Sequence, residues 1–172
     1  MAKLGMKLID GSQLPKNSTQ GFNWLRQAAN CATMEYPEGL YEYALLHEDG
    51  FSTHCFRDHT FMVSLLQAAS DARYGPATCK LAYGYAHGLW GLEKSHLRAF
   101  DHYSVASKLG HSPSFYPLAL YYSGIIARVI PPSAKLAYNF MSKAADCGHA
   151  RAAELVSVFR ACQYGTGVHT FI

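Results

Sequence analysis

Residues 143–149 read KAADCGH, and variants of this stretch recur at three earlier places in the 172-residue chain. The other copies read QAANCAT (27–33), QAASDAR (67–73) and VASKLGH (105–111). Their first alanines follow one another at intervals of 40, 38 and 38 residues: Ala28, Ala68, Ala106 and Ala144. Four copies at nearly one period indicate a repeat protein in which each unit packs against its neighbours.

The residues upstream of each alanine follow the periodicity of a helix, here named the B-type helix. The sixth and third positions before the alanine hold large apolar or aromatic residues in every copy: Phe22, Met62, Phe100 and Tyr138, then Leu25, Leu65, Tyr103 and Met141. This spacing gives one apolar stripe, which the alanines extend where another backbone comes close. Ser95 and Ser133 stand where an N-cap would fall, and Gly110 and Gly148 suit left-handed C-terminal caps.

A second pattern, the A-type helix, lies between the B-type helices. A large residue followed by alanine recurs at 43–44, 81–82 and 118–119, and Gly50, Gly88 and Gly124 follow five or six residues later. The second copy lies in KLAYGYAHGLWG (80–91), whose three glycines suit either a phosphate loop or a helix end. A phosphate loop follows a strand, whereas this stretch is helical in period. We therefore interpret Gly88 as a helix terminator and expect Gly84 to admit a neighbouring helix.

The two patterns together predict alternating helices and no strand. B-type helices are expected at 19–31, 58–72, 95–109 and 133–147, and A-type helices at 37–49, 76–87, 113–123 and 150–163. The predicted fold class is all-α, an α-α superhelix: a short solenoid of antiparallel helix pairs with about three full repeats plus flanking half-repeats. We expect an N-terminal arm at 1–18, a repeat domain at 19–165 and a C-terminal tail at 166–172.

The combined pattern resembles the Sel-one-like repeat, a relative of the tetratricopeptide repeat. The similarity is strongest at 113–150, which contains LALYYSG and KLAYNFMSKAADCGHA, and it extends over roughly residues 19–165. Two features depart from the family pattern: its G-x-G-V turn occurs only at 165–168, and serine replaces the usual aspartate before two B-type helices. The resemblance implies a non-enzymatic module for protein–protein interaction. It also implies adaptor or complex-assembly roles, and short bacterial proteins of this kind include regulators, host-interaction factors and inhibitors of toxins or other enzymes.

Composition argues against several other classes of protein. The chain is 49% hydrophobic and 16% charged, as is typical of a folded domain, and its scattered basic residues give a net charge of only +3. Nucleic-acid binders carry a stronger, clustered excess. No N-terminal apolar stretch is long enough for a signal peptide or a membrane helix. Five cysteines without a C-x-x-C pair indicate reduced thiols, so we expect a cytoplasmic protein with no cofactor.

A cluster of cysteine and histidine residues suggests an alternative function. His54, Cys55 and His59 are ligand types that suit zinc, so a small metal- or thiol-dependent protein is the second hypothesis. No second ligand pair lies nearby, and an exposed loop in which Asp58 caps the next helix explains the cluster without a metal. No metal site is therefore assigned. Cys31 and Cys147 share a repeat position with leucine, which indicates a small apolar packing site.

Candidate partner-binding residues lie on the A-type helices. Acidic residues cluster in and before the first of these helices, where Glu38 and Glu42 repel each other at i,i+4; they form either a solvated face or an acidic patch for a basic partner. A-type helices line the concave surface of such superhelices, and tyrosine gives large contact area at low entropic cost. We expect another protein or a peptide to contact five residues: Glu42, Lys80, Tyr83, His87 and Tyr121. Self-association through the apolar stretch AAELVSVF (152–159) is a further alternative.

Overall fold

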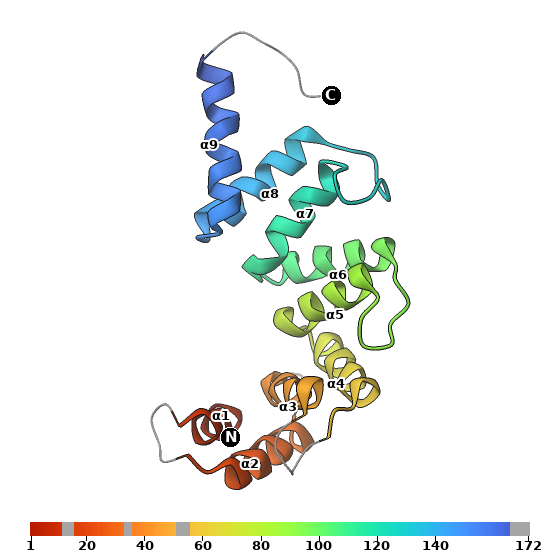
Figure 1. The fold of residues 1–172 in the computed structure, drawn as a ribbon, viewed down its shortest axis with the longest axis vertical. Helices are drawn as coiled ribbons and strands as arrows, with labels where there is room; N and C mark the ends of the chain where they lie inside the picture. Colours follow the sequence, from red (N-terminus) through yellow and green to blue (C-terminus); the bar gives the residue numbers. More distant parts are fainter. Residues whose placement is uncertain (12–15, 33–35, 51–55, 166–172) are drawn as a thin grey trace. The chain divides into compact units, whose positions relative to one another are not determined.

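A computed structural model of the chain describes residues 1–11, 16–32, 36–50 and 56–165 (Figure 1). All regular structure in these ranges is helical, which confirms the all-α prediction. The chain forms two compact units, Met1–Leu109 and Gly110–Ile172. The first unit contains α1 (Ala2–Asp10), α2 (Ser18–Asn30), α3 (Glu38–Asp49), α4 (His59–Asp71), α5 (Gly75–His87) and α6 (His96–Lys108). The second contains a 3₁₀ turn (Ser112–Ser114), α7 (Phe115–Tyr122), α8 (Ala134–Asp146) and α9 (Ala150–Gly165).

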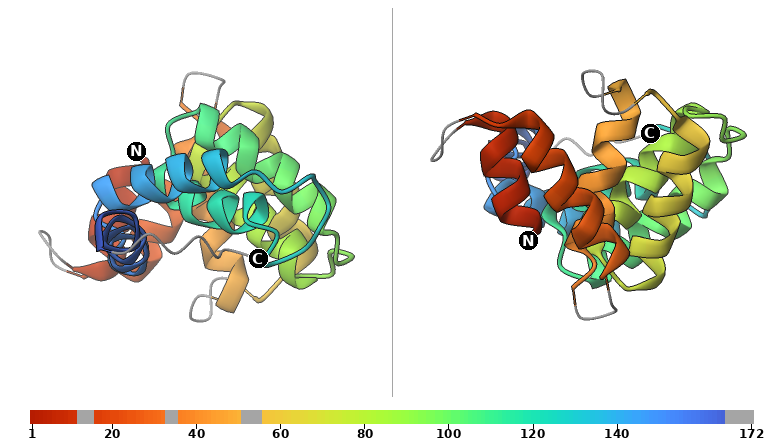
Figure 2. Two further views of the ribbon diagram at one scale, coloured as in Figure 1. Left: turned by 90° about the horizontal axis from the view of Figure 1, so that it is seen from above. Right: turned by 90° about the horizontal axis from the view of Figure 1, so that it is seen from below.

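Each A-type helix before α9, the last described element, is followed by a B-type helix that packs against it. The pairs α1–α2, α3–α4 and α5–α6 form the first unit, and α7–α8 forms the second together with α9. The observed bounds of α2 to α9 differ from the predicted ones by no more than two residues. Helix α1 was not predicted, because the sequence analysis placed residues 1–18 in an arm. It lies beside α2 and supplies an A-type partner for that helix (Figure 2).

All four B-type helices begin with the same kind of side-chain N-cap. Each is 13 residues long, and the side chain of its N-cap residue accepts a hydrogen bond from the backbone N–H three residues later. The caps and their distances are Asn17 (3.0 Å), Asp58 (2.9 Å), Ser95 (3.3 Å) and Ser133 (3.4 Å). Such a cap is worth about 0.5–2 kcal/mol. The predicted caps at Asp58, Ser95 and Ser133 are confirmed, as are the positive φ angles of Gly110 (80°) and Gly148 (87°).

The N-cap positions also correct which residues of α4 were aligned with the buried positions of the other B-type helices. In α4 the fully buried residues are Met62, Leu66 and Ala69, whereas Ala68, which the alanine alignment used, is exposed. Ala69 is the eleventh residue after its N-cap, as Ala106 and Ala144 are after theirs. The QAA sequence of this copy offers two adjacent alanines, so the spacing of alanines could not decide which of them faces the core.

Two apolar clusters lie in the core of the first unit. One consists of Phe22, Leu25, Ala29, Tyr43 and Leu46, from α2 and α3. The other consists of Ala44, Met62, Leu66, Ala69, Ala77 and Leu81, from α3, α4 and α5. Leu40 and Leu65 pack against both clusters. Helix α3 therefore contributes to both clusters and holds a central place in this unit.

Helices α1 and α2 approach each other through a pair of glycines. A Cβ atom on Gly21 would lie 2.8 Å from the carbonyl oxygen of Gly5 and 2.7 Å from Cγ1 of Ile9. A Cβ atom on Gly5 would lie 2.8 Å from Cγ of Leu25. These distances are shorter than a side chain tolerates, so only glycine at both positions permits this backbone contact.

Candidate interaction surface

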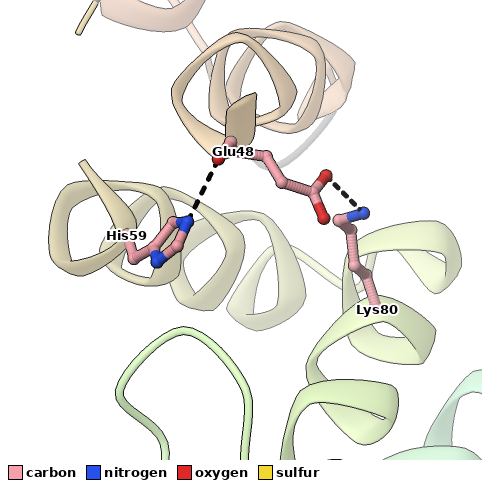
Figure 3. Close-up of polar contacts among 3 residues, drawn as sticks. All are labelled: Glu48, His59 and Lys80. Atoms are coloured by element: carbon pink, nitrogen blue, oxygen red, sulfur yellow. Dashed lines mark hydrogen bonds and ion pairs between the residues drawn. The ribbon is translucent and has the colours of Figure 1, made fainter. Parts of the chain in front are cut away.

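Helices α3 and α5 are joined through Glu48 (Figure 3). The Glu48 carboxylate lies 2.8 Å from Nζ of Lys80 on α5, and both side chains are largely buried (25% and 22% exposed). Its backbone carbonyl accepts a hydrogen bond of 3.0 Å from Nε2 of His59, the first residue of α4. One residue thus ties the end of α3 to both of the next two helices, and the two A-type helices α3 and α5 form one surface.

An aromatic group covers the C-terminal half of α5. The Tyr83 ring centroid lies 4.4 Å from that of His87 and 6.3 Å from that of Trp90. Nζ of Lys80 lies 5.1 Å from the Trp90 ring centroid, within the range of a cation–π contact. Tyr83 is 48% exposed. The structure therefore brings together three of the predicted residues, Lys80, Tyr83 and His87, around a tryptophan that the sequence analysis did not select.

Trp90 reaches this place because the loop at 88–94 folds back over α5. Gly88, Trp90 and Gly91 all have positive φ angles (69°, 57° and 78°), which reverse the chain after α5. A Cβ atom on Gly84 would lie 2.7 Å from Cζ3 of Trp90 and 2.9 Å from Cδ1 of Leu92. The expectation that Gly84 admits a neighbouring helix is therefore wrong. The indole ring of the following loop fills the space that a side chain at 84 would occupy.

The substitution Gly84→Ala tests this packing. Alanine in place of an interior helical glycine normally stabilises a protein by about 0.5–1 kcal/mol. Here the added methyl group must displace the Trp90 indole, so we expect no gain in Tm. In a Trp24→Phe background, the Trp90 fluorescence should shift to longer wavelength as the ring becomes exposed. An unshifted spectrum with a higher Tm would contradict the assignment.

The opposite end of the surface is acidic. Glu38 and Glu42 lie on α3, where burial, followed by the charge of Glu38, raises the pKa of Glu42. Burial, followed by the charges of Glu38 and Glu42, raises the pKa of Tyr74 at the start of α5. The Tyr74 ring meets that of Tyr41 edge-on at 5.5 Å. In the described part of the chain no cation pairs with Glu38 or Glu42, so this end carries uncompensated negative charge.

The raised pKa of Glu42 predicts a pH-dependent stability. Its folded-state pKa lies above the ordinary value of 4.5. The folded state therefore holds this proton more tightly than the unfolded state, and the resulting stability is complete below 4.5 and is lost as the pH rises through the folded-state pKa. Glu42→Gln should raise the free energy of unfolding at neutral pH by about 0.2–0.5 kcal/mol, the size of an i,i+4 repulsion.

Thermal unfolding of the Glu42→Gln variant at several pH values checks this expectation. The difference in Tm between the variant and the wild type should shrink as the pH falls below 4.5, because the wild-type carboxyl is then neutral as well. Glu154→Gln on α9, which removes an exposed carboxylate, provides the control and should change the Tm little at any pH. A lower Tm for Glu42→Gln at neutral pH would contradict the assignment.

Tyr121 lies elsewhere and is not exposed. It belongs to α7 of the second unit, is fully buried (0% exposed), and burial raises its pKa. The prediction that Tyr121 lies outside the apolar stripe is therefore wrong. Tyr121 is the third residue after Leu118, just as Gly84 is the third after Leu81, and both positions are buried. In α5 an indole from the loop fills the space beside this position, whereas α7 carries a large side chain there.

The structure adds little support to the hypothesis of a metal- or thiol-dependent protein. His54 and Cys55 lie outside the described residues, and the described ones contain no group of three side chains that could hold a metal ion. Cys31 and Cys147 are exposed C-cap residues, so their interpretation as packing residues is wrong. Burial raises the pKa of Cys79 to about 11, which keeps this thiol protonated and unreactive at neutral pH.

No helix in the described ranges has the length and apolar character needed to cross a membrane.

Solved structures share this arrangement of helices. A Sel1 repeat protein from Oxalobacter formigenes superposes with a TM-score of 0.80 at 20% identity, over 98% of this chain and 65% of that one. The protein c5321, a protective antigen of uropathogenic Escherichia coli with an SLR fold, gives a TM-score of 0.76 at 22% identity, over 96% and 34% of the two chains. At these identities the similarity shows the fold, and it confirms the solenoid of helix pairs.

Sequence comparison adds a relative and a family. The chitin synthase regulator SKT5 of the fungus Malassezia restricta is 30% identical over 154 residues, which cover 90% of this chain. The chain spans about a tenth of the length of that relative. The Sel1 repeat family model matches residues 1–32, 37–72, 75–111 and 118–149, and the first match includes helix α1. Because these matches cover most of the sequence, the chain belongs to the Sel1 repeat family.

Proposed function

We propose that this chain is a non-enzymatic interaction module that binds another protein or a peptide through α3, α5 and the loop at 88–94, named here the α3–α5 surface. Sel1 repeat proteins generally mediate protein–protein interaction. The observation that carries the choice of surface is the aromatic group of Tyr83, His87 and Trp90, which is partly exposed and lies beside the buried Glu48–Lys80 pair.

The geometry of this group suits a binding site. Tyrosine and tryptophan are enriched among the residues that dominate binding energy at interfaces. Here the rings contact one another, and Lys80 contacts both Trp90 and Glu48. These side chains are already held by contacts within the protein, so they lose little conformational entropy when a partner binds. Little of the favourable interaction energy is therefore offset by an entropic cost.

The role of such a module is to adapt, regulate or inhibit its partner. The fungal relative SKT5 is named a regulator of chitin synthase, and a regulatory role for the present chain, acting in the cytoplasm, accords with that name. Self-association is the alternative use of an exposed surface. Leu155 and Val158 on α9 are 44% and 57% exposed, so the second unit also presents apolar side chains.

Site-specific photo-crosslinking tests the proposal. A benzoylphenylalanine at position 83 should capture a protein from a lysate of the source organism, identified by mass spectrometry. The same group at position 97, on α6, provides the matched control, because Leu97 is an exposed apolar residue (55%) of the same unit outside the α3–α5 surface. Capture of the same protein from both positions would contradict the choice of surface. Capture of only a second copy of this chain at position 83 would replace the proposed partner with self-association.

A further inference from the structure

We infer that the partner presents a basic segment to the α3–α5 surface, with lysine or arginine side chains meeting Glu38 and Glu42 and an apolar or aromatic side chain meeting Tyr83. This inference rests on the proposed function and specifies the chemistry of its partner.

The charges of the described residues point to a cationic ligand. Glu48 is neutralised by Lys80 at 2.8 Å, whereas Glu38 and Glu42 have no cationic partner in the described ranges. The surface therefore keeps two uncompensated carboxylates although the whole chain carries a net charge of +3. Such local charge of one sign steers partners of the opposite sign and excludes those of the same sign.

The two carboxylates also repel each other in the folded state. Glu38 and Glu42 are one helical turn apart on α3, where like charges destabilise a helix, and Glu42 is half-buried. None of the cations among the described residues compensates for this repulsion. A lysine or arginine from a partner would offset the repulsion between Glu38 and Glu42. The relief of this repulsion would then add to the free energy of binding.

The aromatic residues fix the direction of the bound segment. The edge-on pair Tyr41 and Tyr74 lies at the acidic end, where tyrosine rings can add cation–π contacts to a bound lysine or arginine. At the other end the Trp90 ring is already engaged by Lys80, which leaves the half-exposed Tyr83 ring for an apolar contact. From Tyr74, the N-cap of α5, to His87 the helix rises about 20 Å, the length of about six extended residues.

A random peptide library displayed on phage and selected on the full chain tests this inference. We expect the selected peptides to be enriched in lysine or arginine together with an aromatic residue. They should bind the double variant Glu38→Gln/Glu42→Gln about tenfold or more weakly than the wild type. The control variant Asp146→Asn/Glu154→Gln makes the same change in net charge at exposed sites of the second unit, and should bind as the wild type does.

Stability measurements separate binding from folding. The Glu38→Gln/Glu42→Gln variant should be about as stable as the wild type, because the relieved i,i+4 repulsion offsets the lost interaction of Glu38 with the N-terminal dipole of α3. Its loss of binding then cannot come from unfolding. Selection of acidic or uncharged peptides, failure to select any peptide, or equal weakening in both double variants would overturn the inference. The proposed function would survive that result if position 83 still captures a partner by crosslinking while position 97 does not.

Discussion

Replacing Gly21 with valine is expected to force helix α1 off α2 and to lower the free energy of unfolding of the first unit by about 2–3 kcal/mol. The two helices meet backbone to backbone, and a Cβ atom at 21 would lie 2.8 Å from the Gly5 carbonyl oxygen. A backbone carbonyl cannot rotate away as a flexible side chain can. Overpacking of this kind typically costs 1–3 kcal/mol, and α1 would also lose the burial of Leu8.

Urea denaturation followed by circular dichroism measures this loss, and hydrogen exchange locates it. Residues 2–10 should exchange rapidly in the Gly21→Val variant while α4, α5 and α6 stay protected. Asn23→Val, on the exposed side of the same helix, provides the matched control because it introduces the same β-branched residue without the clash. Equal unfolding free energies for the two variants would show that the α1–α2 contact contributes little.

Helix α1 illustrates what the sequence could not predict. Its nine residues, AKLGMKLID, contain neither the recurring alanine motif of the B-type helices nor the large residue followed by alanine that marks the A-type helices. So short a helix is marginal in isolation, and tertiary packing must stabilise it. That packing depends on Gly5 meeting Gly21, a contact between positions that no local pattern links.

The other helices were predictable because their signals are local. N-cap side chains, terminating glycines and apolar spacing all act within one or two helical turns, and they placed α2 to α9 within two residues. The interaction surface was only partly predictable for the same reason. Lys80, Tyr83 and His87 could be selected from one helical stretch, but the contacts of Lys80 with Glu48 and Trp90 join residues of different elements. The fold-back of the loop requires Trp90 itself to adopt a positive φ, which its residue type does not suggest.

Tyr121→Ala and Tyr83→Ala are expected to have opposite consequences. Both tyrosines were selected from the sequence as partner-contacting residues of A-type helices, but Tyr121 is fully buried and Tyr83 is 48% exposed. Truncation of a large buried aromatic side chain costs about 3–5 kcal/mol, from lost burial and from the cavity that remains. Truncation of an exposed one usually changes the free energy of unfolding by about 0.5 kcal/mol or less.

Urea denaturation of the two variants, with hydrogen exchange to locate the change, distinguishes these outcomes. In Tyr121→Ala, α7 and its neighbour α8 should lose protection, because the second unit is small and Tyr121 is among the largest of its fully buried side chains. Tyr83→Ala should unfold as the wild type does but lose the partner captured at the α3–α5 surface. Near-wild-type stability of Tyr121→Ala would show that its burial contributes little to the fold. Unfolding of Tyr83→Ala would instead make that ring part of the structural core, and the aromatic group could then no longer be assigned to binding.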